Sequence, residues 1–180
     1  MNIADKTLET LKTKEIFVDA FTDHYSESFF GFIRNFNENF ILLEHYSDDG
    51  LYNGVIIFRR QDVTRIRWDN NEIKSAYKIA IRKNKIKEIE SIDIASIESI
   101  IKSVDNAFGY VSLQIQEINS DWTIIGQVQE MDNDTIVIKE FGTMSTLDRG
   151  MLMISISDVT RVDAGGLYEN NLMKIHNNNN

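Results

Sequence analysis

The second half of the chain repeats the first half, and this repeat limits the fold of the 180 residues more than any other feature. Segment 31–44 aligns with segment 126–139 at an offset of 95, with apolar residues on apolar residues and Gly31 on Gly126. The register holds over about fifty residues, with one residue gained in an intervening loop. We therefore interpret the chain as a tandem duplication of one small fold.

A four-residue motif, Asp-Val-Thr-Arg, occurs once in each half. It starts at Asp62 and Asp158, and its threonines are Thr64 and Thr160. One interpretation is a binding turn that is present twice. The other is a structural turn before the fifth strand, in which the aspartate accepts hydrogen bonds from backbone N–H groups and the threonine and arginine face outward. The structural interpretation is favoured, because it explains why the same residues persist in both halves without a cofactor.

Each half has the same predicted element order, a short amphipathic helix followed by five short strands about ten residues apart. The helices are expected at 5–14 and 93–104. The strands are expected at 16–22, 28–36, 39–46, 54–60 and 63–68, and again at 110–117, 122–131, 135–141, 151–157 and 159–163.

This order predicts a mainly β protein with short helices, of the α+β class, built from two tandem SH3-type barrels. Five short strands are too few for a sandwich, and a strongly bent five-stranded barrel is helped by a glycine inside its second strand, where Gly31 and Gly126 stand. The expected domains are 1–90, which ends in a linker helix, and 91–176, followed by a disordered tail at 177–180.

Segments 30–43 and 124–138 each contain an apolar strand with a glycine, a polar turn and a second apolar strand, and segment 56–63 is an apolar strand that runs into an arginine pair. This arrangement resembles the Sm-like family of small bent barrels that follow an N-terminal helix. The resemblance implies pairing between the fourth strand of one barrel and the fifth strand of the next. It also implies RNA as a ligand to consider, because Sm-like proteins bind uridine-rich RNA.

The residues of the family's RNA pocket do not carry over to this chain. Ile41 and Ile136 stand where the family has an asparagine, and Asn39 and Asp134 stand at its stacking position. Gln61 replaces the glycine of the family's Arg-Gly pair in the first half. The resemblance therefore implies a fold and a mode of assembly more than RNA recognition.

Charge is distributed unevenly along the chain. Residues 1–90 hold 14 basic and 15 acidic side chains, and residues 91–180 hold 5 and 13. The basic residues between 59 and 87 either contact RNA phosphates or form solvated surface attracted to the acidic second half, and the second interpretation is favoured because stacking aromatic residues are sparse there. The candidate RNA-contacting residues are Arg59, Arg60, Arg65, Arg67, Lys83 and Lys85.

Two long loops, between the third and fourth strands of each half, carry apolar side chains that suit contact with another protein. They are Leu51 and Tyr52 in the first half and Met144 and Leu147 in the second. The alternative is that these side chains only anchor their loops, and the sequence leaves both interpretations open.

The chain lacks the residues of the common catalytic and metal sites. It has no cysteine, three histidines and no nucleophile elbow, so we expect no catalytic residue, cofactor or metal ion. No apolar run approaches the roughly 20 residues that cross a bilayer, which predicts a cytoplasmic protein without membrane contact. The predicted function is a non-enzymatic interaction or assembly protein that binds a protein partner, such as a basic one, or itself. RNA binding through the basic residues is the alternative.

Overall fold

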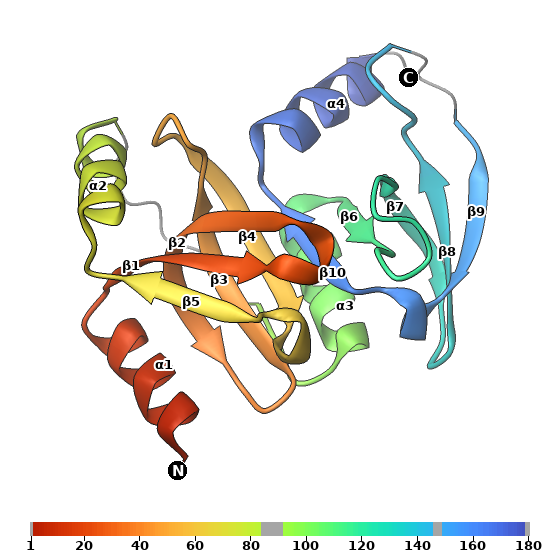
Figure 1. The fold of residues 1–180 in the computed structure, drawn as a ribbon. Helices are drawn as coiled ribbons and strands as arrows, with labels where there is room; N and C mark the ends of the chain where they lie inside the picture. The colour runs from red at the N-terminus through yellow and green to blue at the C-terminus, as the bar shows by residue number, and fades with distance from the viewer. Residues whose placement is uncertain (1, 84–91, 146–148, 179–180) are drawn as a thin grey trace. The chain divides into compact units, whose positions relative to one another are not determined.

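The computed structural model describes residues 2–83, 92–145 and 149–178 (Figure 1). Internal contacts divide the chain into unit 1, Met1–Ile89, and unit 2, Glu90–Asn180. Unit 1 contains α1 (Ile3–Thr13), β1 (Phe17–Thr22), β2 (Glu27–Phe36), β3 (Phe40–Tyr46), β4 (Tyr52–Arg59), β5 (Arg65–Trp68) and α2 (Asn71–Lys83). Unit 2 contains α3 (Ile97–Phe108), β6 (Val111–Gln114), β7 (Thr123–Met131), β8 (Thr135–Glu140), β9 (Met151–Ser155), β10 (Arg161–Ala164) and α4 (Leu167–Asn178).

The prediction of two closed barrels is wrong. The ten antiparallel strands among the described residues form an open sheet and do not close on themselves. With the four helices of the described residues, the fold is of the α+β class. The strand order is β5-β1-β2-β3-β4 in unit 1 and β10-β6-β7-β8-β9 in unit 2. Closing either barrel would require its two outer strands to pair with each other. Instead a short 3₁₀ turn (Arg60–Asp62 in unit 1, Ile156–Asp158 in unit 2) leads to a four-residue strand that pairs with the first strand of its own unit.

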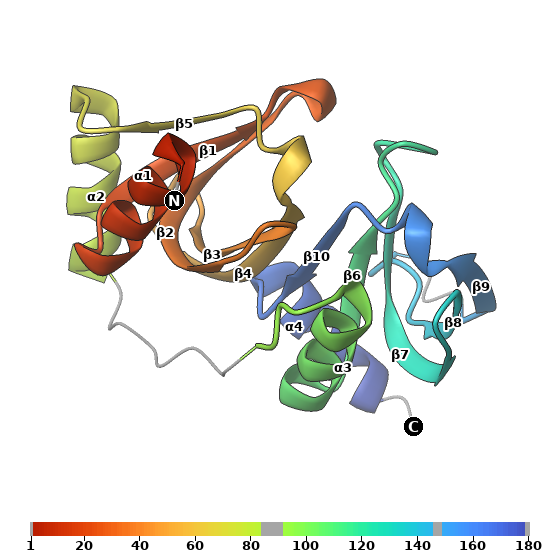
Figure 2. The same ribbon diagram turned by 90° about the horizontal axis from the view of Figure 1, so that it is seen from below.

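Unit 1 places a helix on each face of its sheet, which explains why every residue of β1 is buried. Leu8 and Leu11 of α1 pack with Val18 and other residues of one face. Phe17, the next residue in the chain, points to the other face and packs with Ile73 and neighbouring residues of α2. Figure 2 shows how strongly β2, β3 and β4 curve. The apolar core is therefore two layers on either side of a curved sheet, instead of a barrel interior.

Unit 2 also has two helices against its strands. The helical spacing of apolar residues in α3 buries its apolar face, and α3 packs on β6 and β10. Ser96 caps its first turn, and Gly109 ends the helix with a φ of 75°. Leu172 of α4 packs with Tyr110, Ile125 and Phe141. Both units thus combine an antiparallel sheet with helices on its faces.

The glycine in the second strand of each unit is required by a close approach of backbone. A Cβ atom on Gly31 would lie 2.0 Å from the carbonyl oxygen of Glu44, and one on Gly126 would lie 2.3 Å from the carbonyl oxygen of Lys139. A β-bulge follows each glycine, between Ile33 and Asn35 in β2 and at the matching place in β7. Glycine and bulge together permit the sharp curvature of the second strand.

Replacing either glycine by alanine is expected to destabilise its unit. The added methyl group would overlap a carbonyl oxygen that is fixed in a sheet, so we expect Gly31→Ala and Gly126→Ala to lower the free energy of unfolding by about 2 kcal/mol or more. Urea unfolding measures this. Gly150→Ala is the control, because its nearest atom lies 3.6 Å from the new Cβ. Equal urea midpoints for all three variants would contradict the steric explanation.

Candidate functional site

β9 lies at one end of the strand order of unit 2, and its outer side has backbone N–H and C=O groups that bond to no described residue. It pairs only with β8, with no bulge along the ladder. Gly150 O accepts from Glu140 N, and Ile156 N donates to Asp134 O. Even-numbered residues therefore turn their N–H and C=O groups toward β8, and Met151, Met153 and Ser155 turn theirs outward. We call Met151–Ser155 the β9 edge.

The side chains of the β9 edge are uncharged and mostly apolar. Met151 and Met153 are 63% and 71% exposed, on one face of the strand. On the opposite face Leu152 pairs with Ile138 of β8, which is fully buried, and Ile154 is placed in the same way. Nothing in the sequence of this strand guards it against pairing with another strand, because it contains no lysine, arginine or proline.

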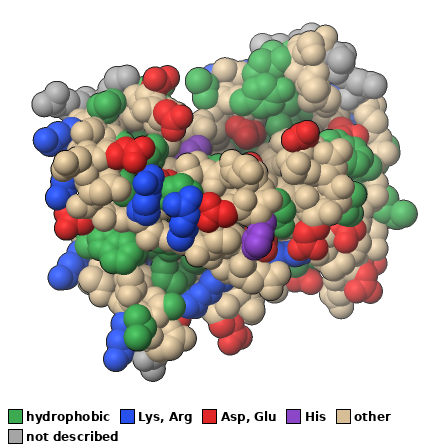
Figure 3. All heavy atoms as spheres, viewed as in Figure 1, with side chains coloured by type: hydrophobic (Ala, Val, Ile, Leu, Met, Phe, Trp, Pro, Cys, Tyr) green, Lys and Arg blue, Asp and Glu red, His purple; other side chains and the backbone are tan. Residues whose placement is uncertain are grey.

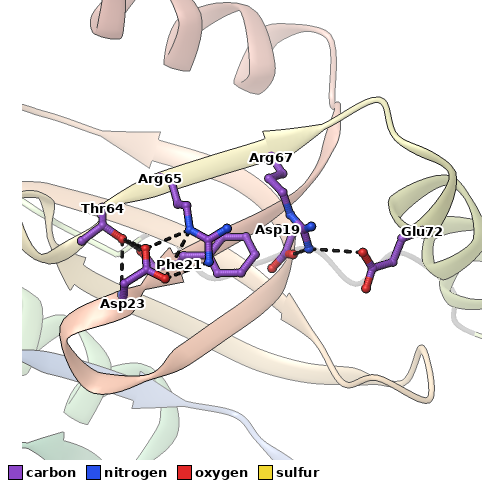
Figure 4. A network of polar contacts seen from close by, with 7 residues as sticks. All are labelled: Asp19, Phe21, Asp23, Thr64, Arg65, Arg67 and Glu72. Carbon is purple, nitrogen blue, oxygen red and sulfur yellow. Dashed lines mark hydrogen bonds and ion pairs between the residues drawn. The ribbon is translucent and has the colours of Figure 1, made fainter.

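The end strand β5 of unit 1, unlike β9, carries charged side chains that oppose pairing with another strand. We call such a strand guarded. β5 is four residues long and contains Arg65 and Arg67, which lie over the ring of Phe21 with guanidinium carbons 3.6 Å and 4.7 Å from its centroid (Figure 4). Charged side chains on a short outer strand oppose strand addition. The two outer strands therefore differ in their capacity to bind another strand.

Arg65 is fixed by a carboxylate on the neighbouring turn. Its Nε and Nη2 atoms donate to both oxygens of Asp23 at 2.8–3.2 Å, and the hydroxyl of Thr64 bonds to the same carboxylate. These hydrogen bonds, first from Arg65 and then from Thr64, lower the pKa of Asp23 to about 2. The charge of Arg65 is thus offset by a group that stays ionised at every pH near neutral.

Arg67 is held by two acidic residues, one of them buried. Its Nη2 atom lies 2.6 Å from Asp19 Oδ2 and 3.2 Å from Glu72 Oε2. Asp19 is 1% exposed, and its Oδ1 atom has no hydrogen-bond partner among the described residues. Burial raises the pKa of Asp19, against the opposing effect of the Arg67 hydrogen bond.

Of the other basic candidates, some contact residues of the protein itself and some lie outside the described residues. Arg60 donates to Asp5 at 2.7 Å and to the carbonyl of Asn37 at 3.0 Å. Arg59 is half-buried at the end of β4, Lys83 is the last residue of α2, and Lys85 lies outside the described residues. On the face in Figure 3, the basic side chains alternate with acidic ones instead of forming one patch.

The loop candidates are exposed where the structure describes them. Leu51 is 42% exposed and Met144 is 37% exposed, each on the surface of its own unit. Tyr52 begins β4 and packs edge to face on Tyr46, with ring centroids 6.0 Å apart. Leu147 lies outside the described residues. Tyr52 therefore serves as a loop anchor, and Leu51 and Met144 are exposed apolar residues on their loops.

The Asp-Val-Thr-Arg motif forms the same turn in both units. Asp62 and Asp158 each end a 3₁₀ turn. The threonine after the turn joins the fifth strand to the first: Thr64 N donates to Phe21 O at 2.9 Å, and Thr160 N donates to Gln114 O at 2.8 Å. Thr64 and Arg65 are exposed, whereas Thr160 and Arg161 are buried instead of facing outward. In both units the motif positions a strand.

The β9 edge was not among the candidates from the sequence, although a strand was expected there. Its signal was present as the uncharged run Met-Leu-Met-Ile-Ser. Among the described residues, no group of three or more His, Asp or Glu side chains could hold a metal ion, and no helix is long and apolar enough to cross a membrane. No protein-family model, curated protein or solved structure compared with the chain matches it.

The two threonines of the repeated motif offer a matched test of their hydroxyl groups. Thr160 is buried, donates to Gln114 O at 3.0 Å and accepts from Gln116 N at 3.1 Å. Thr160→Val leaves that N–H without its acceptor and should cost about 1–3 kcal/mol in urea unfolding. Thr64→Val makes the same chemical change at an exposed position and should cost about 0.5 kcal/mol. Equal losses would show that burial does not set the effect.

The raised pKa of Asp19 predicts a pH dependence of folding stability. A carboxyl group whose pKa is raised by folding binds its proton more tightly in the folded protein, so its contribution to stability falls as pH rises from acid toward neutral. Asp19→Asn removes this titration. We therefore expect the stability difference, wild type minus Asp19→Asn, to decrease between pH 3 and pH 7 in urea unfolding. A constant difference would exclude the effect.

Proposed function

We propose that this protein is a non-catalytic binding protein that captures an extended, basic segment of a partner protein as an added strand on the β9 edge. The observation that carries the proposal is the contrast between β9, which is uncharged and unpaired on its outer side, and β5, which two arginines guard. Main-chain hydrogen bonds to an exposed strand supply affinity in this mode, and contacts of alternate side chains supply specificity.

The backbone of the β9 edge sets the register of the added strand. Met151, Met153 and Ser155 offer three N–H groups and three carbonyl oxygens, two residues apart, to a partner backbone. The exposed thioethers of Met151 and Met153 can adapt to partner side chains of different shapes. These features favour a partner segment with apolar residues at alternate positions.

The charge of unit 2 supports a basic partner. Residues 91–180 carry a net charge of −8, from 5 basic and 13 acidic side chains. Acidic residues lie at both ends of the β9 edge, with Glu140 beside Gly150 and Asp158 in the turn that follows the strand. Such charges speed the approach of a basic segment and oppose the approach of an acidic one, including a second copy of this unit.

RNA binding has weaker support. Three of the six basic candidates, Arg60, Arg65 and Arg67, are paired with carboxylates of the protein itself. An RNA phosphate would have to compete with those carboxylates for each arginine. For this reason we propose binding of a protein partner, instead of RNA, as the function.

Calorimetric titration with a synthetic peptide tests strand addition. The peptide alternates valine and threonine and carries two lysines at each end. Met153→Pro removes an outward N–H without touching the β8 ladder, and Met153→Lys adds a guarding charge. Both variants should bind the peptide at least tenfold more weakly than wild type. Ile118→Lys is the matched control, because Ile118 is 61% exposed and belongs to the segment between β6 and β7 instead of β9.

The same titration separates the alternatives. A peptide with glutamates in place of the lysines should bind at least tenfold more weakly, since the charge of unit 2 then opposes it. Equal binding by wild type and Met153→Pro would contradict strand addition on β9. A dimer that sedimentation detects in wild type and not in Met153→Pro would assign the edge to a second copy of the chain instead of a partner.

A further inference from the structure

Unit 2 contains a cavity of about 520 Å³ that the proposed function does not use. Its walls come from β6, β7, β8 and β10, and from the first turn of α4. This volume is within the range of pockets that hold small organic ligands. Two exposed aromatic rings stand at the cavity, Trp122 before β7 and Tyr168 on α4, at 42% and 45% exposure.

The repeat shows that this cavity is specific to unit 2. Gln114 corresponds to Phe21, because each accepts the backbone hydrogen bond of the motif threonine and each pairs with the motif arginine, Arg161 or Arg65. In unit 1 the Phe21 ring and two guanidinium groups fill this position (Figure 4). In unit 2 a glutamine replaces the ring, and the space is open.

The motif arginine of unit 2, Arg161, lies in the wall of this cavity. Arg161 is buried and donates through Nε and Nη2 to both oxygens of Asp163 at 3.0–3.2 Å. Asp163 occupies the place of Arg67 in unit 1, since it pairs with Ser112 as Arg67 pairs with Asp19. Where unit 1 has a cation, unit 2 thus has an anion, and this anion offsets the charge of Arg161.

Most of the charged residues in the described lining of the cavity are acidic. Besides Asp163, the carboxylates of Asp121, Glu140 and Glu169 line it, and Arg161 is the single basic residue in the described lining. Burial raises the pKa of Glu169, and the charge of Asp163 raises it further. A bound cation would stabilise the charged form of Glu169 and would lie beside two aromatic rings, whose faces attract cations.

We propose that this cavity binds an organic cation, a guanidinium or primary ammonium group on a short apolar stem, with Trp122 and Tyr168 against the stem and the cavity carboxylates around the head. The carboxylate oxygens accept from the N–H groups of such a head, and charge-assisted hydrogen bonds of this kind are strong. The cation comes either as a free small molecule or as an arginine or lysine side chain of another protein. The proposal shares Glu140 with the acidic surroundings of the β9 edge and otherwise rests on other residues.

Indole fluorescence gives a direct test in the full-length protein. Trp68→Phe leaves Trp122 as the one tryptophan of the chain, so its emission reports on the cavity. Titration with agmatine, a short apolar stem with a guanidinium group at one end and a primary ammonium group at the other, should change that emission with saturation. A neutral urea of the same length should bind at least tenfold more weakly. Equal responses to both compounds, or no response to agmatine and to an arginine peptide, would overturn the proposal.

Charge variants distinguish binding at this specific cavity from general attraction of a cation to an acidic protein. Glu169→Gln should weaken agmatine binding about tenfold, because it removes one acceptor charge and keeps the shape. Glu130→Gln removes the same charge at an exposed position of β7 and should leave binding unchanged. Equal weakening by the two variants would overturn the proposal.

Comparing the titrations with agmatine and with an arginine peptide identifies the source of the cation. Repeating them in a β9 variant distinguishes the cavity from the β9 edge. Saturable binding of agmatine supports a free ligand. Binding only of a peptide with a single arginine supports the same cavity with a protein side chain as its occupant. Both titrations are repeated in Met153→Pro, which should weaken strand addition at least tenfold and leave cavity binding intact. Loss of agmatine binding in Met153→Pro would overturn the assignment to the cavity.

Discussion

The hydrogen bond from the motif threonine to the first strand of its unit determines much of the rest of the structure. It commits the fifth strand of each unit to β1 or β6, at 2.9 Å in unit 1 and 2.8 Å in unit 2. Closing a barrel would also require the fifth strand to pair with the fourth, and the order of the described strands contains no such pair. The sheet of each unit therefore remains open, and in unit 2 this leaves β9 with a single partner. The binding properties that we propose for β9 follow from this unpaired edge.

The two units show how one scaffold can acquire different surfaces through few changes. Both keep the close approach at the glycine, the bulge, the 3₁₀ turn and the threonine. They differ where the fifth strand faces the first. Phe21 and Arg67 produce a filled, charged surface in unit 1, and Gln114 and Asp163 produce a cavity in unit 2. The conserved backbone carries the fold, and the variable side chains carry the differences in binding that we propose.

Local features of the fold could be predicted from the sequence, and long-range ones could not. The helix expected at 93–104 is found as α3, four residues later at Ile97–Phe108, and the need for Gly31 and Gly126 follows from the close approach that a Cβ would block. The choice between a closed and an open sheet depends on which distant strands pair, which alternating apolar residues do not encode. The Asp19–Arg67 pair likewise joins positions 48 apart in the chain. The outer position of β9 became visible only once the strand order was known.

The guard on β5 is electrostatic, and this makes the two outer strands respond differently to salt. The Arg65–Asp23 pair lies at the surface, with about half of each side chain exposed, where dissolved ions screen such pairs within roughly 10 Å at 0.1 M. The apolar surface of β9 has no charge to screen, and strongly hydrated salts such as sulfate favour its burial. Rising ionic strength therefore weakens the electrostatic guard on β5 and leaves the apolar surface of β9 at least as able to bind as before. Association through β5 is therefore weakest in buffer of low ionic strength. The preference of an added strand for β9 over β5 decreases as the salt concentration rises.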